Sequence, residues 1–194
     1  MSTAAVVLAA GAGSRYQGNT HKLLALWKGR SVVRHALDPV LAAGFDEVIV
    51  VDGAVDLSDV LSGARVTLLH NPAWADGQAT SLRVAIAAAD HAGHEAVVVG
   101  LGDQPLIPAE VWRAVAASDA PLAVASYGGR RRNPVRLHRS VWSLLPVAGD
   151  EGARTLMRAR PELVTEVACE GDPMDVDTVE DLRALDADAP RRGP

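Results

Sequence analysis

The first residues of the chain combine glycines with two cations in an order that suits a polyphosphate. The run Leu8-Ala9-Ala10-Gly11-Ala12-Gly13-Ser14-Arg15 is followed by Lys22. Glycine lets the backbone approach a ligand closely, and successive free N–H groups in such a turn can cradle an anion. Arg15 and Lys22 would add mobile positive charge. The run predicts a phosphate-binding loop, with a plain strand-to-helix turn as the alternative.

Two common phosphate-binding motifs do not fit this run. A Walker A loop needs Lys and Ser/Thr directly after its second glycine, but Gly18 is followed by Asn19. A dinucleotide fingerprint needs a third glycine at the position of Tyr16. The loop must therefore be of another kind if it binds phosphate.

Three aspartates offer ligands for a divalent cation. Asp103 follows a hydrophobic run, and an aspartate at the end of a buried strand faces the crevice where open α/β sheets bind ligands. Asp175 and Asp177 precede the last expected helix, and strand alternation would put both on one side. Mg²⁺ (or Mn²⁺) prefers such oxygen ligands together with phosphate oxygens. Asp177 is slightly favoured as the partner of Asp103, and the alternative is that these residues only form turns and caps.

Hydrophobic runs alternate with helical patterns along the chain, which predicts a single three-layer Rossmann-like α/β domain with a mostly parallel, mixed sheet. The runs are nearly continuous, as in strands buried on both faces, and cover Ala5–Ala9, Glu47–Asp52, Arg65–Leu69, Glu95–Leu101 and Pro121–Ser126. The helical patterns cover Ser31–Ala43, Ala79–Ala92, Pro108–Ala117 and Val179–Leu185, with Ser31 and Thr178 as candidate N-caps. Asp186–Pro194 is polar and is expected to be a frayed tail.

Composition argues against several classes of protein. The 194 residues suit one domain, and the net charge of -5 with one short basic cluster, Arg130-Arg131-Arg132, does not suit a nucleic-acid binder. The single cysteine, Cys169, fits a reducing compartment. No apolar run approaches the roughly 18 residues of a membrane span. We expect a cytoplasmic protein without nucleic-acid or membrane partners.

The loop Leu8–Gly13, with Arg15 and Lys22, resembles the signature loop of the sugar- and cofactor-nucleotidyltransferases. Further segments resemble motifs of their molybdenum cofactor cytidylyltransferase branch: Asn71–Leu82, Gly102–Pro105, Gly149–Arg154 and Asp175–Thr178. A fifth, Arg130–Val135, resembles that branch's Gly-His-Pro-Val segment with Asn133 in place of histidine. Two other departures are the long stretch Tyr16–His21 and Val179, where proline is common.

The resemblance implies a metal-dependent nucleotidyltransferase whose N-terminal half binds nucleotide and whose C-terminal half binds an acceptor. An acceptor phosphate oxygen would attack the α-phosphorus in line and release pyrophosphate. The implied nucleotide-binding residues are Leu8, Ala9, Ala10, Gly11, Ala12, Gly13, Ser14, Gly77 and Ser81. Arg15, Lys22 and Asp103 would be catalytic, and Asp103 with Asp177 or Asp175 would hold the metal. The implied acceptor-binding residues are Arg132, Asn133, Pro134, Asp150 and Arg154.

The substrates stay open at this point. The Leu-Ala-Ala-Gly and Ser-Leu forms favour CTP with a molybdopterin acceptor, whereas the guanylyl branch, which uses GTP, usually carries Leu-Ala-Gly-Gly. Sugar phosphates and other small phosphates are alternative acceptors. A different class is a non-catalytic accessory protein that delivers a cofactor to a molybdoenzyme. Arg15, Lys22 and Asp103 argue against it, because a pure binder would not need all three.

Overall fold

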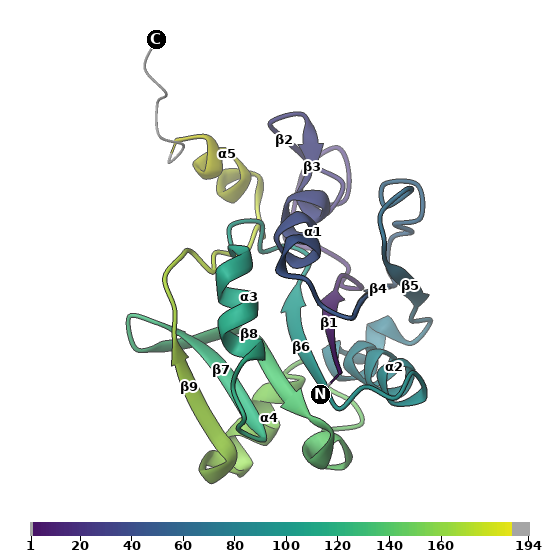
Figure 1. Ribbon diagram of the computed structural model, residues 1–194. Coiled ribbons are helices and arrows are strands. Elements are labelled where there is room, and N and C mark those ends of the chain that lie inside the picture. The colour runs from purple at the N-terminus through teal and green to yellow at the C-terminus, as the bar shows by residue number, and fades with distance from the viewer. Residues whose placement is uncertain (1, 188–194) are drawn as a thin grey trace.

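The computed structural model describes residues 2–187, in which seven strands form one sheet (Figure 1). The order across the sheet is β5-β4-β1-β6-β8-β7-β9. β8 is antiparallel to both β6 and β7, and the other neighbouring pairs are parallel. The strands are β1 (Thr3–Leu8), β4 (Glu47–Asp52), β5 (Thr67–His70), β6 (Ala96–Leu101), β7 (Leu122–Tyr127), β8 (Arg130–His138) and β9 (Val164–Ala168).

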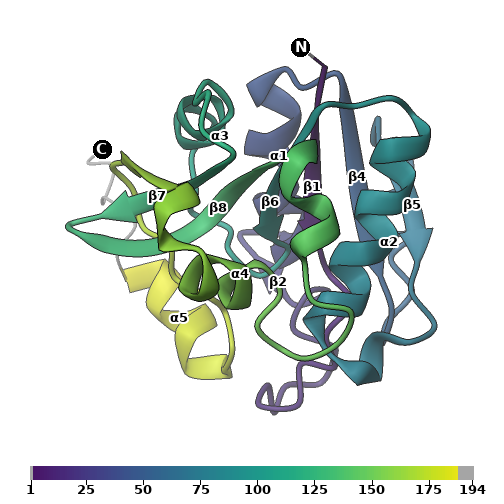
Figure 2. The same ribbon diagram turned by 90° about the horizontal axis from the view of Figure 1, so that it is seen from below.

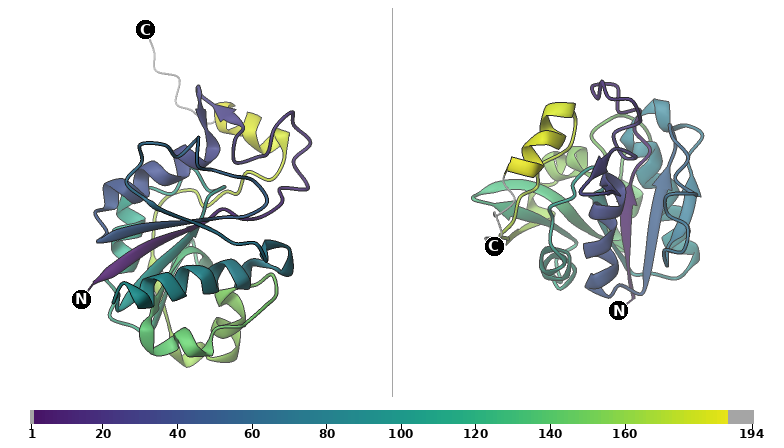
Figure 3. Two further views of the ribbon diagram at one scale, coloured as in Figure 1. Left: turned by 90° about the vertical axis from the view of Figure 1, so that its right-hand side faces the viewer. Right: turned by 90° about the horizontal axis from the view of Figure 1, so that it is seen from above.

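Helices cover both faces of this sheet. α1 (Val32–Ala43) and α3 (Ala109–Ala116) pack on one face, and α2 (Gln78–His91) and α4 (Ala153–Ala159) pack on the other. The left view of Figure 3 shows these layers, and Figure 2 shows α2 and α4 in front of the same face. Successive strand residues serve opposite faces: Val6 packs with the α2 side and Val7 with the α1 side. The predicted three-layer α/β architecture is confirmed.

A smaller cluster lies beyond the carboxyl ends of the central strands. It joins the hairpin β2 (Leu26–Trp27) and β3 (Arg30–Ser31) to the last helix, α5 (Val179–Ala187), around the buried side chain of Val176. Figures 1 and 3 show α5 beside the hairpin. Short 3-10 helices cover Trp74–Asp76, Arg139–Leu144 and Pro161–Leu163. No helix in the described part of the chain could cross a membrane.

The caps of the helices follow the sequence in part. At the start of α5, Thr178 Oγ1 accepts from the Asp181 N–H (3.1 Å) and Asp181 Oδ2 accepts from the Thr178 N–H (2.8 Å). This reciprocal pair confirms the predicted cap. Ser31 occupies the N-cap position of α1, but its hydroxyl makes no capping hydrogen bond. Pro108 lies one residue earlier than expected, at the N-cap of α3.

Two expectations about segments need correction, and one strand was not predicted. Asp175 and Asp177 do not lie on a strand, because residues 172–177 have no regular secondary structure. Residues 186 and 187, expected to belong to a frayed tail, belong to α5; residues 188–194 lie outside the described part. The acceptor segment Arg130–Val135 lies within strand β8, which the hydrophobic pattern does not reveal because its first half is arginine-rich and exposed.

Candidate active site

Strand register brings the glycine loop beside Asp103. β1 and β6 are parallel neighbours with Leu8 opposite Leu101, and the Gly102 N–H donates to the Leu8 carbonyl (2.9 Å). The two chains therefore leave the sheet side by side. A Cβ at Gly102 would lie 3.0 Å from the Ala9 Cβ, so glycine lets the second loop follow the first closely.

Lys22 joins the two acidic segments. Its Nζ lies 2.5 Å from Asp103 Oδ2 and 2.9 Å from Asp177 Oδ1, and all three side chains are at most 21% exposed. Arg15, which is exposed, reaches Asp177 Oδ2 at 2.8 Å. Burial would lower the pKa of Lys22, but the charges and hydrogen bonds of Asp103 and Asp177 outweigh it and raise this pKa. Lys22 is therefore a permanent cation between two carboxylates at neutral pH.

The donor set around Lys22 fits a hard divalent cation. Asp103 Oδ1 is buried and has no hydrogen-bond partner among the described residues. The described part of the chain holds no group of three His, Cys, Asp or Glu side chains placed to bind a metal. Two carboxylates completed by phosphate oxygens are the environment that Mg²⁺ usually takes, since it is rarely held in an all-protein cage.

Asp175 is close to this cluster but plays a different part from Asp177. Its Oδ1 is buried without a hydrogen-bond partner in the described residues, and its side chain does not line the cavity formed by the loop. Burial, followed by the charges of Asp103 and Asp177, raises the pKa of Asp175 to about 6. Asp177 is therefore the better placed partner of Asp103.

The raised pKa of Asp175 predicts a pH dependence of stability. Because folding raises this pKa above the ordinary 3.8, the protonated carboxyl favours the folded state. The contribution of Asp175 to the free energy of unfolding is therefore complete below pH 4 and is lost as the pH rises through about 6. Relative to Asp175→Asn, the wild type should lose about 2 kcal/mol of unfolding free energy between pH 4 and 7. Urea unfolding with EDTA present measures this difference. If the unfolding free energies of the two proteins change equally with pH, the pKa of Asp175 is not raised by folding.

A cavity of about 410 Å³ lies over the glycine loop. Residues 8–15 form one wall, and Lys22, Asp103 and Asp177 lie in it. Trp74 also lines the cavity. A Cβ at Gly53 would lie 2.7 Å from the Trp74 Cβ and 2.9 Å from the Ala10 Cβ, so glycine at the end of β4 lets the tryptophan approach the loop. The cavity therefore offers a backbone cradle, two cations and an aromatic ring, as a nucleotide requires.

Gly77 and Ser81 both line this cavity, and both also contact other segments of the protein. Gly77 has φ +106°, and a Cβ there would lie 2.5 Å from the carbonyl carbon of Gly149. Ser81 is buried, and its Oγ accepts from the Asn71 side-chain amide (2.8 Å). Gly77 thus fixes the 149–150 loop against the start of α2, and Ser81 presents a hydroxyl whose direction Asn71 sets.

The two loop glycines differ in what the fold requires of them. Gly13 has φ +62°, and a Cβ there would lie 3.0 Å from His21 Nε2. Gly11 lacks positive φ, and a Cβ there would meet no described atom within 4 Å. His21 braces the loop: its Nε2 lies 3.0 Å from the Gly11 carbonyl, and its Nδ1 accepts from the Leu23 N–H (3.3 Å). The described structure therefore does not require a glycine at position 11, and the open space there would let a ligand approach the backbone closely.

Gly11→Ala is therefore expected to separate binding from folding. We expect an unchanged melting temperature and at least about tenfold weaker nucleotide binding, because the added methyl occupies space that the phosphates need. Gly13→Ala should instead lower the melting temperature, since it strains the backbone. Calorimetric titration with CTP and thermal unfolding check both variants. Gly11→Ala with wild-type affinity would show that no ligand comes close to this residue.

A second cavity, of about 610 Å³, opens beside the first. Its floor is apolar and comes from the sheet, α2 and α4: Leu8, Leu82, Val99, Leu101, Val124, Val135 and Met157. Four arginines surround it: Arg131, Arg132, Arg154 and Arg158. Arg131 pairs with Glu166 and Arg158 with Glu151, whereas Arg132 and Arg154 form no ion pair with a described residue. These two free cations suit an anionic group on a ligand with an apolar body.

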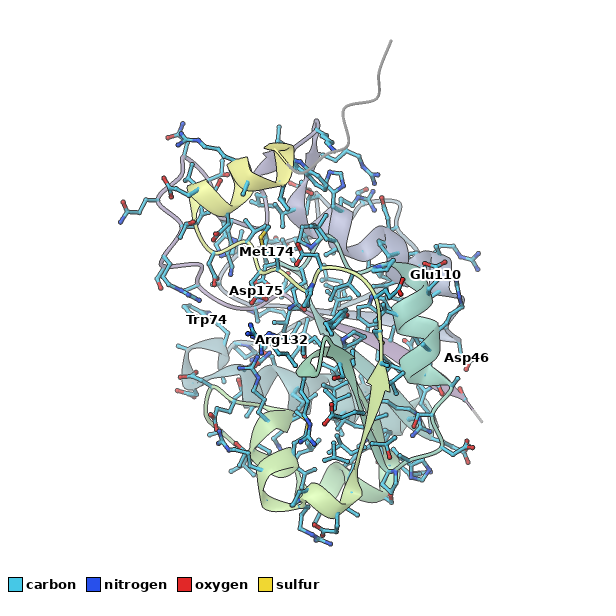
Figure 4. All side chains as sticks on the ribbon, turned by 90° about the vertical axis from the view of Figure 1, so that its left-hand side faces the viewer. Asp46, Trp74, Glu110, Arg132, Met174 and Asp175 are labelled. Carbon is cyan, nitrogen blue, oxygen red and sulfur yellow. The ribbon has the colours of Figure 1, made fainter. Side chains whose placement is uncertain are left out.

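The expected acceptor residues divide between the two cavities. Arg132, Asn133 and Arg154 line the second cavity, but Asp150 lines the first. Pro134 lines neither: it is buried in β8, where the pairing with β7 shifts register. Tyr127 donates its hydroxyl to the Asn133 carbonyl (3.0 Å) and holds this irregular segment. Figure 4 shows Trp74, Arg132 and Asp175, which come from three distant segments, near one edge of the sheet.

Several lining residues were not expected from the sequence. Trp74 and Gln78 belong to the segment Asn71–Leu82, in which only Gly77 and Ser81 were expected to contact the nucleotide, and only spacing within that segment could have indicated them. The apolar floor could not have been recognised, because a core residue and a cavity floor have the same hydrophobic pattern.

Comparison with known proteins agrees with this geometry. The model of the MobA-like NTP transferase domain matches residues 5–164. Nicotine blue oxidoreductase of Paenarthrobacter nicotinovorans is 32% identical over 197 aligned positions, covering 93% of this chain and 94% of that protein. Rv0371c of Mycobacterium tuberculosis H37Rv superposes with a TM-score of 0.82 at 30% identity, covering 95% of this chain and 97% of the other.

Two further solved structures bear on the chemistry. A nucleotidyl transferase from Methanothermobacter thermautotroptrophicus superposes with a TM-score of 0.83 at 25% identity, covering 96% of this chain and 97% of the other. Rv0371c has also been solved in complex with manganese. The family match spans most of the chain, and it includes the glycine loop, Lys22 and Asp103. The chain belongs to the MobA-like NTP transferase family and is a nucleotidyltransferase of that family.

Proposed function

We propose that this protein transfers CMP from CTP to a phosphorylated acceptor with a fused ring system, such as molybdopterin, and releases pyrophosphate. The observation that carries the proposal is the position of Lys22. This lysine lies between Asp103 and Asp177 in the loop cavity, and the arginine-rimmed cavity opens beside it. A triphosphate site and an anion-binding acceptor site would then adjoin each other within one domain, the first mainly from the N-terminal half and the second mainly from the C-terminal half.

The residues divide the work as follows. The loop backbone from Gly11 to Ser14 holds the triphosphate, and Arg15 and Lys22 offset the charge that builds on the phosphates and on the departing pyrophosphate. Asp103 and Asp177 hold Mg²⁺ or Mn²⁺, which when bound supplies Lewis-acid stabilisation of phosphate charge. An oxygen of the acceptor phosphate forms the new bond to the α-phosphorus as the bond to pyrophosphate breaks. No general base is needed, because a phosphate monoester is already ionised near neutral pH.

The lining of the second cavity supports an acceptor with a flat ring system over a sugar phosphate. A sugar needs many hydrogen-bonding side chains, whereas this floor consists mostly of aliphatic residues and Met157. Arg132 and Arg154 would take the phosphate. CTP is favoured over GTP because the loop has the form Leu8-Ala9-Ala10-Gly11.

A pyrophosphate-release assay tests the proposal directly. The four ribonucleoside triphosphates are each incubated with Mg²⁺ and with molybdopterin, glucose 1-phosphate or 1-naphthyl phosphate. The fastest release is expected with CTP and molybdopterin, and glucose 1-phosphate should be the poorest acceptor. Equal rates for all triphosphates, or release only with the sugar phosphate, would refute the substrate assignment. Tight CTP binding without turnover would instead favour the accessory-protein alternative.

A redox function is a second candidate, because one relative over nearly the whole chain is named nicotine blue oxidoreductase. The loop cavity could hold the nucleotide part of NADH or NADPH, and the apolar floor could hold a planar substrate. Hydride transfer would not require the arrangement of Lys22, Asp103 and Asp177, so nucleotidyl transfer is favoured. Oxidation of NADH or NADPH followed at 340 nm, with nicotine blue present, separates the two. Metal-independent oxidation by the Asp103→Asn variant would favour the redox function.

A further inference from the structure

Gln78 lies at the passage between the two cavities. Only three described residues line both: Leu8, Gln78 and Leu101. Gln78 is the one of the three with a polar side chain. Its amide makes no hydrogen bond to any other residue in the described part of the chain and is half-exposed. A free amide with two donors and one acceptor therefore faces the place where the two ligands meet.

The backbone around Gln78 is held firmly. Gly77 packs against Gly149, the Gly149 N–H donates to the Asp76 carbonyl (3.2 Å), and the Ala79 N–H donates to the Gly149 carbonyl (2.9 Å). Gln78 is thus flanked on both sides by contacts to the loop that leads into α4. Its Oε1 lies 3.6 Å from the position of a Cβ on Gly152, at the start of that helix. This support limits the positions that the amide can take.

Transfer requires an acceptor oxygen and the α-phosphorus to meet at the passage, since one ligand lies in each cavity. From this placement we infer that Gln78 orients the acceptor: its amide N–H donates to an oxygen of the acceptor phosphate and directs that phosphate toward the α-phosphorus. The inference rests on the proposed function and deepens it. A neutral amide suits this role because it adds a directional hydrogen bond to the phosphate whose charge Arg132 and Arg154 already offset.

The test compares Gln78→Leu and Gln78→Glu with the wild type and with Arg83→Gln. Arg83 is exposed on the same helix and lines neither cavity. Calorimetric titration with 1-naphthyl phosphate, with CTP titrated separately, measures each site without turnover. Gln78→Leu should weaken 1-naphthyl phosphate binding by about tenfold or more, since a hydrogen bond to an ionised group is lost. Gln78→Glu should weaken it at least as much, because a carboxylate cannot donate and repels the phosphate.

CTP affinity should change by less than about threefold in both variants, and Arg83→Gln should match the wild type throughout. Unchanged binding of 1-naphthyl phosphate by Gln78→Leu, wild-type binding by Gln78→Glu, or an equal loss of CTP affinity would each overturn the inference while leaving the proposed function standing. A wild type that binds CTP but not 1-naphthyl phosphate would overturn the proposed acceptor class and this inference together.

Discussion

Replacing Asp103 with asparagine is expected to lower the rate of nucleotidyl transfer by about 10³-fold or more, with the fold retained. Asparagine has almost the same shape, so the contacts of the neighbouring backbone, including the Val176 N–H to Asp103 carbonyl bond (2.9 Å), should persist. Lys22 would keep its bond to Asp177. The variant would lack one of the two carboxylates that fit a metal, and with it most of the stabilisation of charge on the phosphates.

Two measurements check this expectation. Pyrophosphate release gives the rate, and the electron paramagnetic resonance signal of free Mn²⁺ gives metal affinity, which should fall in parallel. Asp59→Asn is a matched control, because Asp59 is exposed and lines no part of either cavity. Asp103→Asn with a rate within tenfold of the wild type would remove Asp103 from the metal site.

Replacing Lys22 with methionine is expected to affect both activity and stability. The two carboxylates beside Nζ would face each other with the exposed Arg15 as their one remaining ion-pair partner among the described residues, which should cost about 1–3 kcal/mol of unfolding free energy without metal. Transfer should fall by about 10³-fold, because a cation beside the phosphates is lost. Added Mg²⁺ should raise the melting temperature of the variant more than that of the wild type, since it replaces the missing positive charge.

Lys28→Met provides the same chemical change at the other lysine of the chain, which is exposed on the β2–β3 hairpin. Its transfer rate should equal that of the wild type, and its response to Mg²⁺ should be unaltered. If Lys22→Met keeps its activity, or if Mg²⁺ stabilises it no more than the wild type, the ammonium does not hold the acidic pair together.

The sequence predicts that most of the residues lining the loop cavity come together. The glycines, Arg15 and Lys22 follow one strand, and Asp103 follows another, so the parallel arrangement alone places them at one edge of the sheet. The register of β1 with β6 adds what spacing could not: it brings Ala9 beside Gly102. The sequence could not show that Asp177 lines the loop cavity and Asp175 does not. The expected strand does not form, and an irregular segment has no alternation from which side-chain directions can be predicted.

The acceptor side was less predictable, for physical reasons. β8 contains four arginines and a buried proline, which hide its strand character from any pattern of hydrophobic residues. Asp150 lines the loop cavity because Gly77 allows the 149–150 loop to pack against the start of α2, a contact between residues distant in sequence. The position of Gln78 depends on the same contact. Such placements follow from tertiary packing and leave no periodic signal in the chain.

The fate of labelled CTP tests the central claim, which is that the Gly11–Lys22 loop holds a triphosphate for attack at its α-phosphorus. The protein is incubated with Mg²⁺, an acceptor and CTP labelled with ³²P at the α position or, in parallel, at the γ position. We expect the α label in the acceptor product and the γ label in pyrophosphate. An α label that stays in CTP or appears only in free CMP, or a γ label released as inorganic phosphate, would contradict the claim.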